Sequence, residues 1–241
     1  MTILAVCGLK KEAKIAGGVG VIAVSGGGDA KALGVKLDAI TDDITGIISF
    51  GIAGALSPLL KPGDVVIAER IVTARHSLRA EGPAEEQYSL KPRQDTLDET
   101  WRCDNAWRVA LTAALPHAHQ GQIFGSDVII EKAETKSGLY DTTGALAVDM
   151  ESQVAARFAA KRNLPLAALR VISDDASHVL PPAALVAMKP DGGIALGRVL
   201  GSLLRKPTQV PALVRTARAS NRAFAELLRC RDLCGVGLGG V

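Results

Sequence analysis

Val148-Asp149-Met150-Glu151-Ser152 and Arg170-Val171-Ile172-Ser173-Asp174 each place an acidic residue at the end of a short apolar run. Runs of this kind, short and rich in aliphatic residues, are typical of buried strands. In α/β folds the ligand site lies where strands give way to loops or helices. We therefore expect the carboxylates of Glu151 and Asp174 to point into one pocket.

Similar apolar runs recur along the chain, and several are separated by segments with the wider apolar spacing of helices. The predicted strands are Ile3–Cys7, Val19–Val24, Gly46–Phe50, Val65–Ala68, Val128–Ile130, Ala145–Val148 and Leu166–Ile172, and the predicted helices are Asp29–Leu37, Asn105–Leu115 and Met150–Arg162. This alternation predicts an α/β fold. The length of 241 residues allows one domain or two small ones, and we favour a single domain.

Composition and charge exclude several classes of function. A net charge of +3 and an aromatic content of 3% argue against nucleic-acid binding. The four cysteines and four histidines show no metal-binding spacing, so we predict no metal site. The first apolar stretch is too short for a signal peptide, and no apolar run approaches the roughly 18 residues of a transmembrane helix. These features favour a cytoplasmic protein.

The C-terminal region has an amphipathic pattern at 211–229, with apolar residues on one face and arginines on another. Eight basic residues and one acidic residue lie in 197–231, which gives this segment a net charge of +7. We expect a helix docked on the core with a solvated basic face. The alternative is peripheral contact with the anionic inner face of the membrane. The polar segment 76–99 is predicted to be a lid or a mobile loop, and its role is open.

Three glycine-bearing segments follow predicted strands. Gly26, Gly27 and Gly28 open a predicted helix and are a candidate anion site, although such a turn is more often only a connection. Its spacing fits neither a dinucleotide-binding nor a Walker loop. Segment 50–56 is either a pocket wall or a site of tight packing. In Gly8-Leu9-Lys10-Lys11-Glu12, Glu12 is either a third acid of the same site or an exposed acid at a helix start.

Taken together, these segments resemble the nucleoside phosphorylase and nucleosidase superfamily, which includes purine nucleoside phosphorylases and methylthioadenosine nucleosidases. The resemblance covers Met1 to about Ala176 and is most specific in the two opening segments. It implies a central mixed sheet flanked by helices, and a homo-oligomer. Residues 1–230, with the helix at 211–229, would form the catalytic domain, and residues 231–241 a flexible tail.

The resemblance also implies roles for individual residues. Glu151 would bind the ribose hydroxyls and Met150 would pack on the sugar, while Asp174 would give a proton to N7 of the purine. Proton donation there would stabilise a leaving group that gains electron density. Ala53, Gly54 and Ser173 are further expected substrate contacts.

The loop after the first strand bears on whether water or phosphate is the attacking group. Phosphorylases of this group hold phosphate with an arginine there, whereas this chain has Lys10, Lys11 and Glu12, which resembles the hydrolytic branch. Glu12 would then activate water as a general base, and Arg170 would help to position it. Phosphate as a co-substrate, held near Gly26–Gly28, is the alternative. No cofactor is implied. Ile52 stands where many nucleosidases have serine.

Segment 190–229 is similar to hopanoid-associated phosphorylases. This narrower resemblance implies an adenosyl hopanoid as substrate, giving adenine and a ribosyl hopanoid. The alternatives are a methylthioadenosine or S-adenosylhomocysteine nucleosidase acting on small soluble substrates, and a binding protein without turnover. The presence of Glu12, Glu151 and Asp174 together argues against the binding protein.

Overall fold

The structure is a computed structural model that describes residues 1–73, 99–179 and 205–240, with residues 181, 192, 193, 195, 197, 199 and 202 from the intervening segment. Apart from Glu99, which begins β5, the predicted loop at 76–99 lies outside the described residues. The described strands are β1 (Ile3–Cys7), β2 (Val21–Ser25), β3 (Gly46–Ala55), β4 (Val65–Thr73), β5 (Glu99–Arg102), β6 (His119–Gly125), β7 (Ala147–Asp149) and β8 (Leu166–Asp174). The helices are α1 (Lys10–Ala16), α2 (Ala30–Asp38), α3 (Asn105–Ala114), α4 (Ala133–Thr143), α5 (Ser152–Arg162) and α8 (Val210–Cys234), with short 3₁₀ turns at Pro207–Gln209 and Val236–Gly239.

The strands form one mixed sheet that closes partly on itself. The order is β2-β1-β3-β7-β6-β4-β5, and β8 pairs in parallel with β3 and antiparallel with β4. Strands β3, β7, β6, β4 and β8 therefore make a closed ring, from which β1 and β2 extend on one side and β5 on the other. Both expectations, an α/β class and a mixed central sheet flanked by helices, are confirmed.

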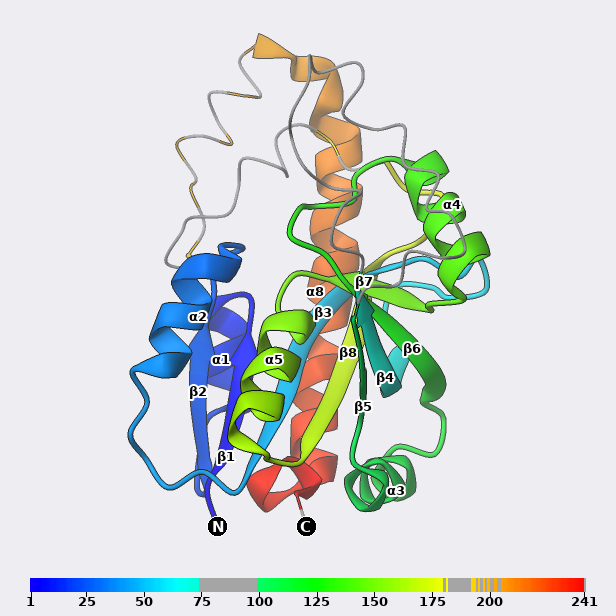
Figure 1. The fold of residues 1–241 in the computed structure, drawn as a ribbon. Coiled ribbons are helices and arrows are strands. Elements are labelled where there is room, and N and C mark those ends of the chain that lie inside the picture. The colour runs from blue at the N-terminus through cyan, green and yellow to red at the C-terminus, as the bar shows by residue number, and fades with distance from the viewer. Residues whose placement is uncertain are drawn as a thin grey trace.

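Two hydrophobic cores lie on the two faces of this sheet. Side chains alternate along a strand, so Leu4 and Val6 of β1 join the core under α2 and α5, whereas Ile3 and Ala5 join the core under α1, α3 and α8. Figure 1 shows α5 in front of β3 and β8, α8 behind them, and both chain ends at the foot of the sheet. No helix within the described residues is long and apolar enough to cross a bilayer.

Local sequence signals set the ends of several elements. Asp29 accepts a hydrogen bond from the N–H of Ala32 (2.9 Å) and Asp104 one from Trp107 (2.8 Å), so aspartate caps begin α2 and α3. Gly144 ends α4 in the left-handed conformation (φ 66°), which glycine adopts at little cost. The strands β3, β4 and β8 extend beyond their predicted ends.

The predicted strand Val128–Ile130 is wrong. Those residues lie in a connection after β6, where the Ser126 hydroxyl donates to the carbonyl of Val128 (2.6 Å). The strand β6 comes just before it and begins with polar residues, so its apolar signal is weak. Its Gly121 packs against Leu146, and a Cβ there would lie 2.7 Å from Leu146 Cδ1.

The expected flexible tail at 231–241 is also wrong as far as residue 240. Helix α8 continues to Cys234, five residues beyond the predicted end at 229, and Cys230 and Cys234 are buried. Leu238 is fully buried, and its carbonyl accepts a hydrogen bond from Trp107 Nε1 (2.9 Å). Arg231 Nε donates to the carbonyl of Ala16 (3.0 Å). The C-terminal residues are thus hydrogen-bonded to α1 and α3.

Candidate active site

A buried guanidinium lies at the centre of the site. Arg170, on β8, is fully buried and forms an ion pair with Asp149 at the end of β7. Its Nη2 lies 3.8 Å from Glu151 Oε2 and donates to the hydroxyl of Ser49. Asp149 also accepts a hydrogen bond from the Ser152 hydroxyl. Burial opposes the guanidinium charge, but the surrounding acids together raise the pKa of Arg170.

Glu12 belongs to the same site, because its side chain points inward from the first turn of α1 and is 1% exposed. Its Oε2 accepts hydrogen bonds from the N–H groups of Gly8 and Leu9 (both 2.7 Å), and Oε1 accepts one from Ile52 (2.9 Å). The alternative of an exposed acid at a helix start is therefore wrong. Burial raises the pKa of the Glu12 carboxyl, against the opposing effects of Arg170 and the three N–H groups.

Glycines leave room for these charges. A Cβ on Gly8 would lie 2.9 Å from Glu151 Oε1. A Cβ on Gly51 would lie 2.6 Å from Nη1 of Arg170 and 2.8 Å from Oε1 of Glu12. A side chain at either position would collide with the charged groups, so the glycines are required by close approach.

Glu151 is 6% exposed, at the start of α5. Burial, Asp149 and Glu12 raise the pKa of its carboxyl to about 8, and Arg170 opposes them. The site thus gathers three carboxylates around one guanidinium.

Stability is expected to fall with rising pH because of Glu151. A folded pKa of about 8, against an ordinary value of 4.5, makes the folded state bind the proton more tightly than the unfolded chain. This contribution is fully present below about pH 4.5 and is lost as the pH rises through about 8. In urea titrations the wild type should lose on the order of a few kcal/mol relative to Glu151→Gln across this range. Parallel pH profiles for the two proteins would contradict the assignment.

The second half of the site surrounds Asp174, the last residue of β8, which is 7% exposed. Its Oδ2 lies 2.5 Å from Nζ of Lys136, on α4, and its Oδ1 lies 2.8 Å from the hydroxyl of Ser173. That hydroxyl also lies 3.1 Å from the carbonyl of Ala53. A Cβ on Gly54 would lie 3.2 Å from Asp174 Oδ2.

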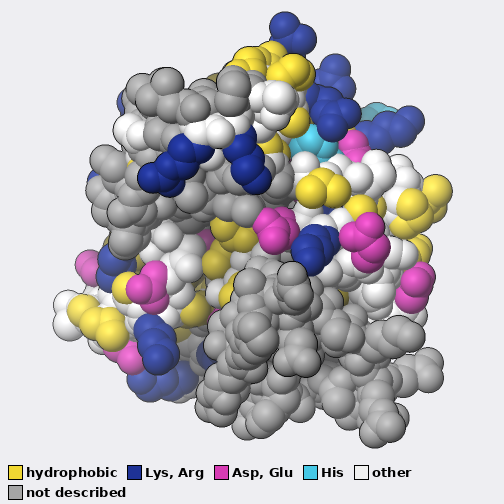
Figure 2. Space-filling view, turned by 90° about the horizontal axis from the view of Figure 1, so that it is seen from above, with side chains coloured by type: hydrophobic (Ala, Val, Ile, Leu, Met, Phe, Trp, Pro, Cys, Tyr) yellow, Lys and Arg dark blue, Asp and Glu magenta, His cyan; other side chains and the backbone are white. Residues whose placement is uncertain are grey.

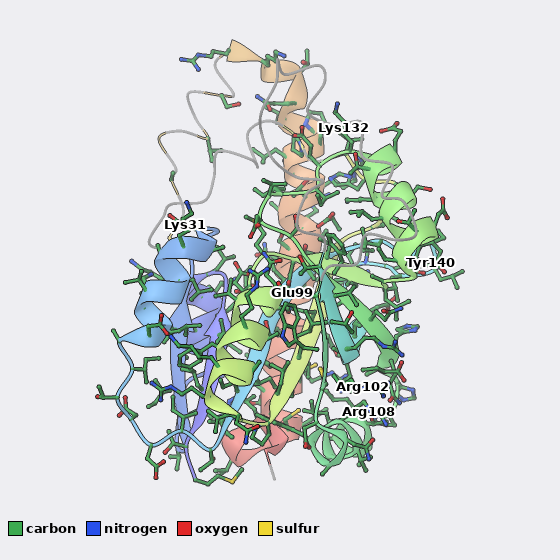
Figure 3. All side chains as sticks on the ribbon, viewed as in Figure 1. Lys31, Glu99, Arg102, Arg108, Lys132 and Tyr140 are labelled. Atoms are coloured by element: carbon green, nitrogen blue, oxygen red, sulfur yellow. The ribbon has the colours of Figure 1, made fainter. Side chains whose placement is uncertain are left out.

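Strand β3 joins the two halves. The N–H of Ile52 binds Glu12, and two residues later Gly54 lies against Asp174. The register of β3 against β8 shifts between Ala53 and Gly54, where Gly54 pairs with Asp174. Segment 50–56 is therefore tightly packed against the charged groups of the site. Its role as a pocket wall stays a prediction. In Figure 3 the labelled residues Lys31, on α2, and Lys132, just before α4, lie toward the end of the molecule that carries the site. Arg102 and Arg108 lie at the opposite end.

The remaining predicted site residues lie less centrally. Met150 is half-buried between Asp149 and Glu151. In the glycine turn, the N–H groups of Gly26 and Gly27 donate to the carbonyls of Cys7 and Gly8 (both 2.8 Å). Two of its three N–H groups are thus already used by the chain itself, as in a plain strand-to-helix connection.

Lys11, one of the two candidate cations of the first loop, packs against an aromatic ring. Nζ of Lys11 lies 3.9 Å from the centroid of the Phe224 ring, on α8, so this side chain points toward the C-terminal helix. Among the described residues, no group of three His, Cys, Asp or Glu side chains can hold a metal ion.

Sequence reasoning missed two charged residues of the site, Asp149 and Lys136. Asp149 directly follows the apolar run that ends at Val148, so it carries the same sequence signal as Glu151 two residues later. Lys136 shares a buried stripe of α4 with Leu139 and Thr143. A lysine at the spacing of an apolar face was the available signal, because a buried lysine requires a partner.

A family model described as Phosphorylase superfamily matches residues 12–203. The chain belongs to this superfamily. The match confirms the resemblance to nucleoside phosphorylase and nucleosidase enzymes that the two opening segments indicated.

Individual relatives agree with the family. The chain is 25% identical over 186 residues to the 5'-methylthioadenosine/S-adenosylhomocysteine nucleosidase of Mycobacterium bovis, covering 68% of each chain. Its fold is similar to an S-adenosylhomocysteine nucleosidase of Streptococcus pyogenes bound to 5-methylthiotubericidin (TM-score 0.60, 18% identity, 94% of this chain and 96% of that one). It is also similar to a Helicobacter pylori 5'-methylthioadenosine/S-adenosylhomocysteine nucleosidase bound to butyl-thio-DADMe-Immucillin-A (TM-score 0.61, 16% identity, 94% and 96%).

Proposed function

We propose that this superfamily member cleaves the N-glycosidic bond of a purine nucleoside with water as the attacking group. The observation that carries the choice of water is the charge of the site. Three carboxylates, from Glu12, Asp149 and Glu151, surround the single guanidinium of Arg170. Arg170 is already paired with Asp149, so even with Glu151 protonated below about pH 8 the site offers no spare guanidinium charge for a phosphate dianion. The acidic groups can instead stabilise the positive charge that develops on the ribosyl carbon.

In this proposal Glu12, Glu151 and Asp174 have three different roles. Glu12 accepts three N–H bonds, which fix its orientation and leave it capacity to accept a proton from one water molecule. Glu151 is the residue predicted to bind the ribose hydroxyls. It lies near Arg170 and packs so closely against Gly8 that a Cβ there would collide with its carboxyl group. Asp174, at the end of β8, lies against Gly54, which is two residues along β3 from the Glu12 contact at Ile52. In this proposal it provides the proton for the departing purine.

The test is adenine release from adenosine, 5'-methylthioadenosine and S-adenosylhomocysteine, each with and without inorganic phosphate. We expect release at the same rate in both conditions, with free ribosyl sugar as the second product. A rate that depends on phosphate, or a sugar 1-phosphate product, would establish phosphorolysis instead. No release from any purine nucleoside would overturn the proposal in favour of a binding protein.

For the substrate itself we propose an adenosyl hopanoid. The support comes from the C-terminal region, where Val210 and Val214 are 44% and 42% exposed beside the exposed Arg215 and Arg218. Figure 2 looks down on the molecule from above. It shows Lys and Arg side chains gathered along one edge, on the side where α8 lies. Exposed apolar and basic groups together suit an anionic membrane surface, where a lipid-linked nucleoside would be met.

A small soluble substrate is the second candidate, favoured by the curated nucleosidase relatives. Adding adenosylhopane in vesicles to the same panel separates the two. Efficient cleavage of 5'-methylthioadenosine without release of adenine from adenosylhopane would reject the lipid substrate. Homo-oligomerisation and membrane contact stay predictions.

A further inference from the structure

Lys136 is a fully buried lysine in direct contact with the candidate acid. It lies on α4 in the same buried stripe as Leu139 and is among the largest side chains with no exposed surface. Its Nζ lies 2.5 Å from Asp174 Oδ2, 3.1 Å from the carbonyl of Asp175 and 3.1 Å from the carbonyl of His178.

The three contacts match the three N–H donors of a charged lysine. An ammonium group has three N–H donors, whereas a neutral amine has two, and all three acceptors of Lys136 lie within hydrogen-bond distance. The geometry therefore fits a charged Lys136 beside an ionised Asp174. The second oxygen of Asp174 has the Ser173 hydroxyl beside it.

An ionised Asp174 has no proton of its own to give to a leaving purine. The ammonium of Lys136 is the acid already hydrogen-bonded to that carboxylate. We propose that Lys136 positions Asp174 and supplies the proton that Asp174 passes to the base. This inference rests on the proposed function.

The proton transfer is balanced. An N–H bond of Lys136 breaks as an O–H bond forms on Asp174, and this O–H bond breaks as N7 of the purine is protonated. Lys136 ends as a neutral amine, Asp174 as a carboxylate and the purine as a neutral base. The positive charge appears on the ribosyl carbon, and water attacking there gives its proton to Glu12. Before the next turnover Glu12 releases its proton to solvent and Lys136 regains one from solvent.

The side chains of Asp175 and His178, the neighbouring titratable residues, have other hydrogen-bond partners. The Asp175 carboxylate accepts a hydrogen bond from the Ser177 hydroxyl (2.6 Å), and despite partial burial this bond and His178 lower its pKa. The His178 ring nitrogen Nε2 lies 2.9 Å from the Thr216 hydroxyl of α8, and burial together with Arg215 lowers the pKa of the ring. Only the backbone carbonyls of Asp175 and His178 contact the ammonium.

The test compares Lys136→Met with the wild type across pH. At pH 8 we expect kcat to fall by about 100-fold or more, with KM changed far less, because the acid has lost its proton source. The ratio of the variant rate to the wild-type rate should rise as the pH is lowered toward 5, because solvent then replaces Lys136 as the source of the proton. Lys136→Arg, which keeps the cation, should retain activity at pH 8 better than Lys136→Met.

Controls keep a folding defect apart from the proposed role. Removing one partner of a buried pair is destabilising, so each variant is checked by thermal unfolding, together with Lys136→Met/Asp174→Asn, which removes both charges. Lys161→Met, at the far end of α5 and 67% exposed in its side chain, is the matched control and should behave like the wild type.

A folded Lys136→Met protein with wild-type kcat at pH 8, or with the same loss of kcat at every pH, would overturn the inference. The proposed function would survive that result, because wild-type release of adenine without phosphate is measured separately. Failure of the wild type to release any base would instead remove the proposed function.

Discussion

Replacing Asp174 with asparagine is expected to lower kcat for purine release by about 100- to 10,000-fold. Asparagine keeps the size of the side chain and its contact with Ser173 but cannot pass a proton to the base. Because the proton stabilises the leaving group only in the transition state, KM should change much less than kcat. Steady-state release of adenine from the best nucleoside of the panel measures both constants.

The neighbouring Asp175→Asn is the matched control. Its carboxylate is bonded to Ser177 rather than to Lys136, so we expect activity close to that of the wild type. The opposite pattern, with Asp175→Asn inactive and Asp174→Asn active, would assign the acid to Asp175. Asp174→Asn also leaves the buried ammonium of Lys136 without its counter-charge, so its thermal unfolding must be measured at the assay temperature.

The parts of the fold that follow from sequence are those where burial dominates. Strands β1 and β8 are buried along almost their whole length and were predicted within two residues at each end. Strand β6 starts with polar residues and depends on Gly121 packing against Leu146, a contact between segments that local pattern does not contain. The run Val128–Ile130 is apolar because it packs in a small cluster with Leu139 and Tyr140, without being a strand.

The site divides in the same way. Glu12, Glu151 and Asp174 could be named because each follows or ends an apolar run, whereas the role of Arg170 comes from the family resemblance. The structure places Glu12, Glu151 and Arg170 in one cluster. The sequence does not show whether an acid at the start of a helix points outward or inward, so both interpretations of Glu12 are compatible with it. Its burial depends on Gly8 and Gly51, and on β3 offering the N–H of Ile52.

Replacing Glu12 with glutamine is expected to lower kcat by about 100-fold or more, because the amide cannot accept a proton from the attacking water. Substrate affinity should change less, since Glu151 and Asp174 keep their places. The amide also cannot accept all three N–H bonds, so one or two buried donors lose their partner at a cost of about 1–3 kcal/mol each. Adenine release and urea unfolding, measured on the same preparation, separate the two effects.

Glu134→Gln provides the comparison that decides between the roles of Glu12. Both residues lie in the first turn of a helix, α1 and α4, but Glu134 is exposed and Glu12 is buried. A carboxylate that acts only through the helix dipole contributes about 0.3–1 kcal/mol, so the two variants would then differ little. The general-base role instead requires a loss of kcat in Glu12→Gln at a temperature where the protein stays folded, with Glu134→Gln fully active. Equal activity of the two folded variants would move the base away from Glu12, and water would then have to be activated by the remaining carboxylates around Arg170.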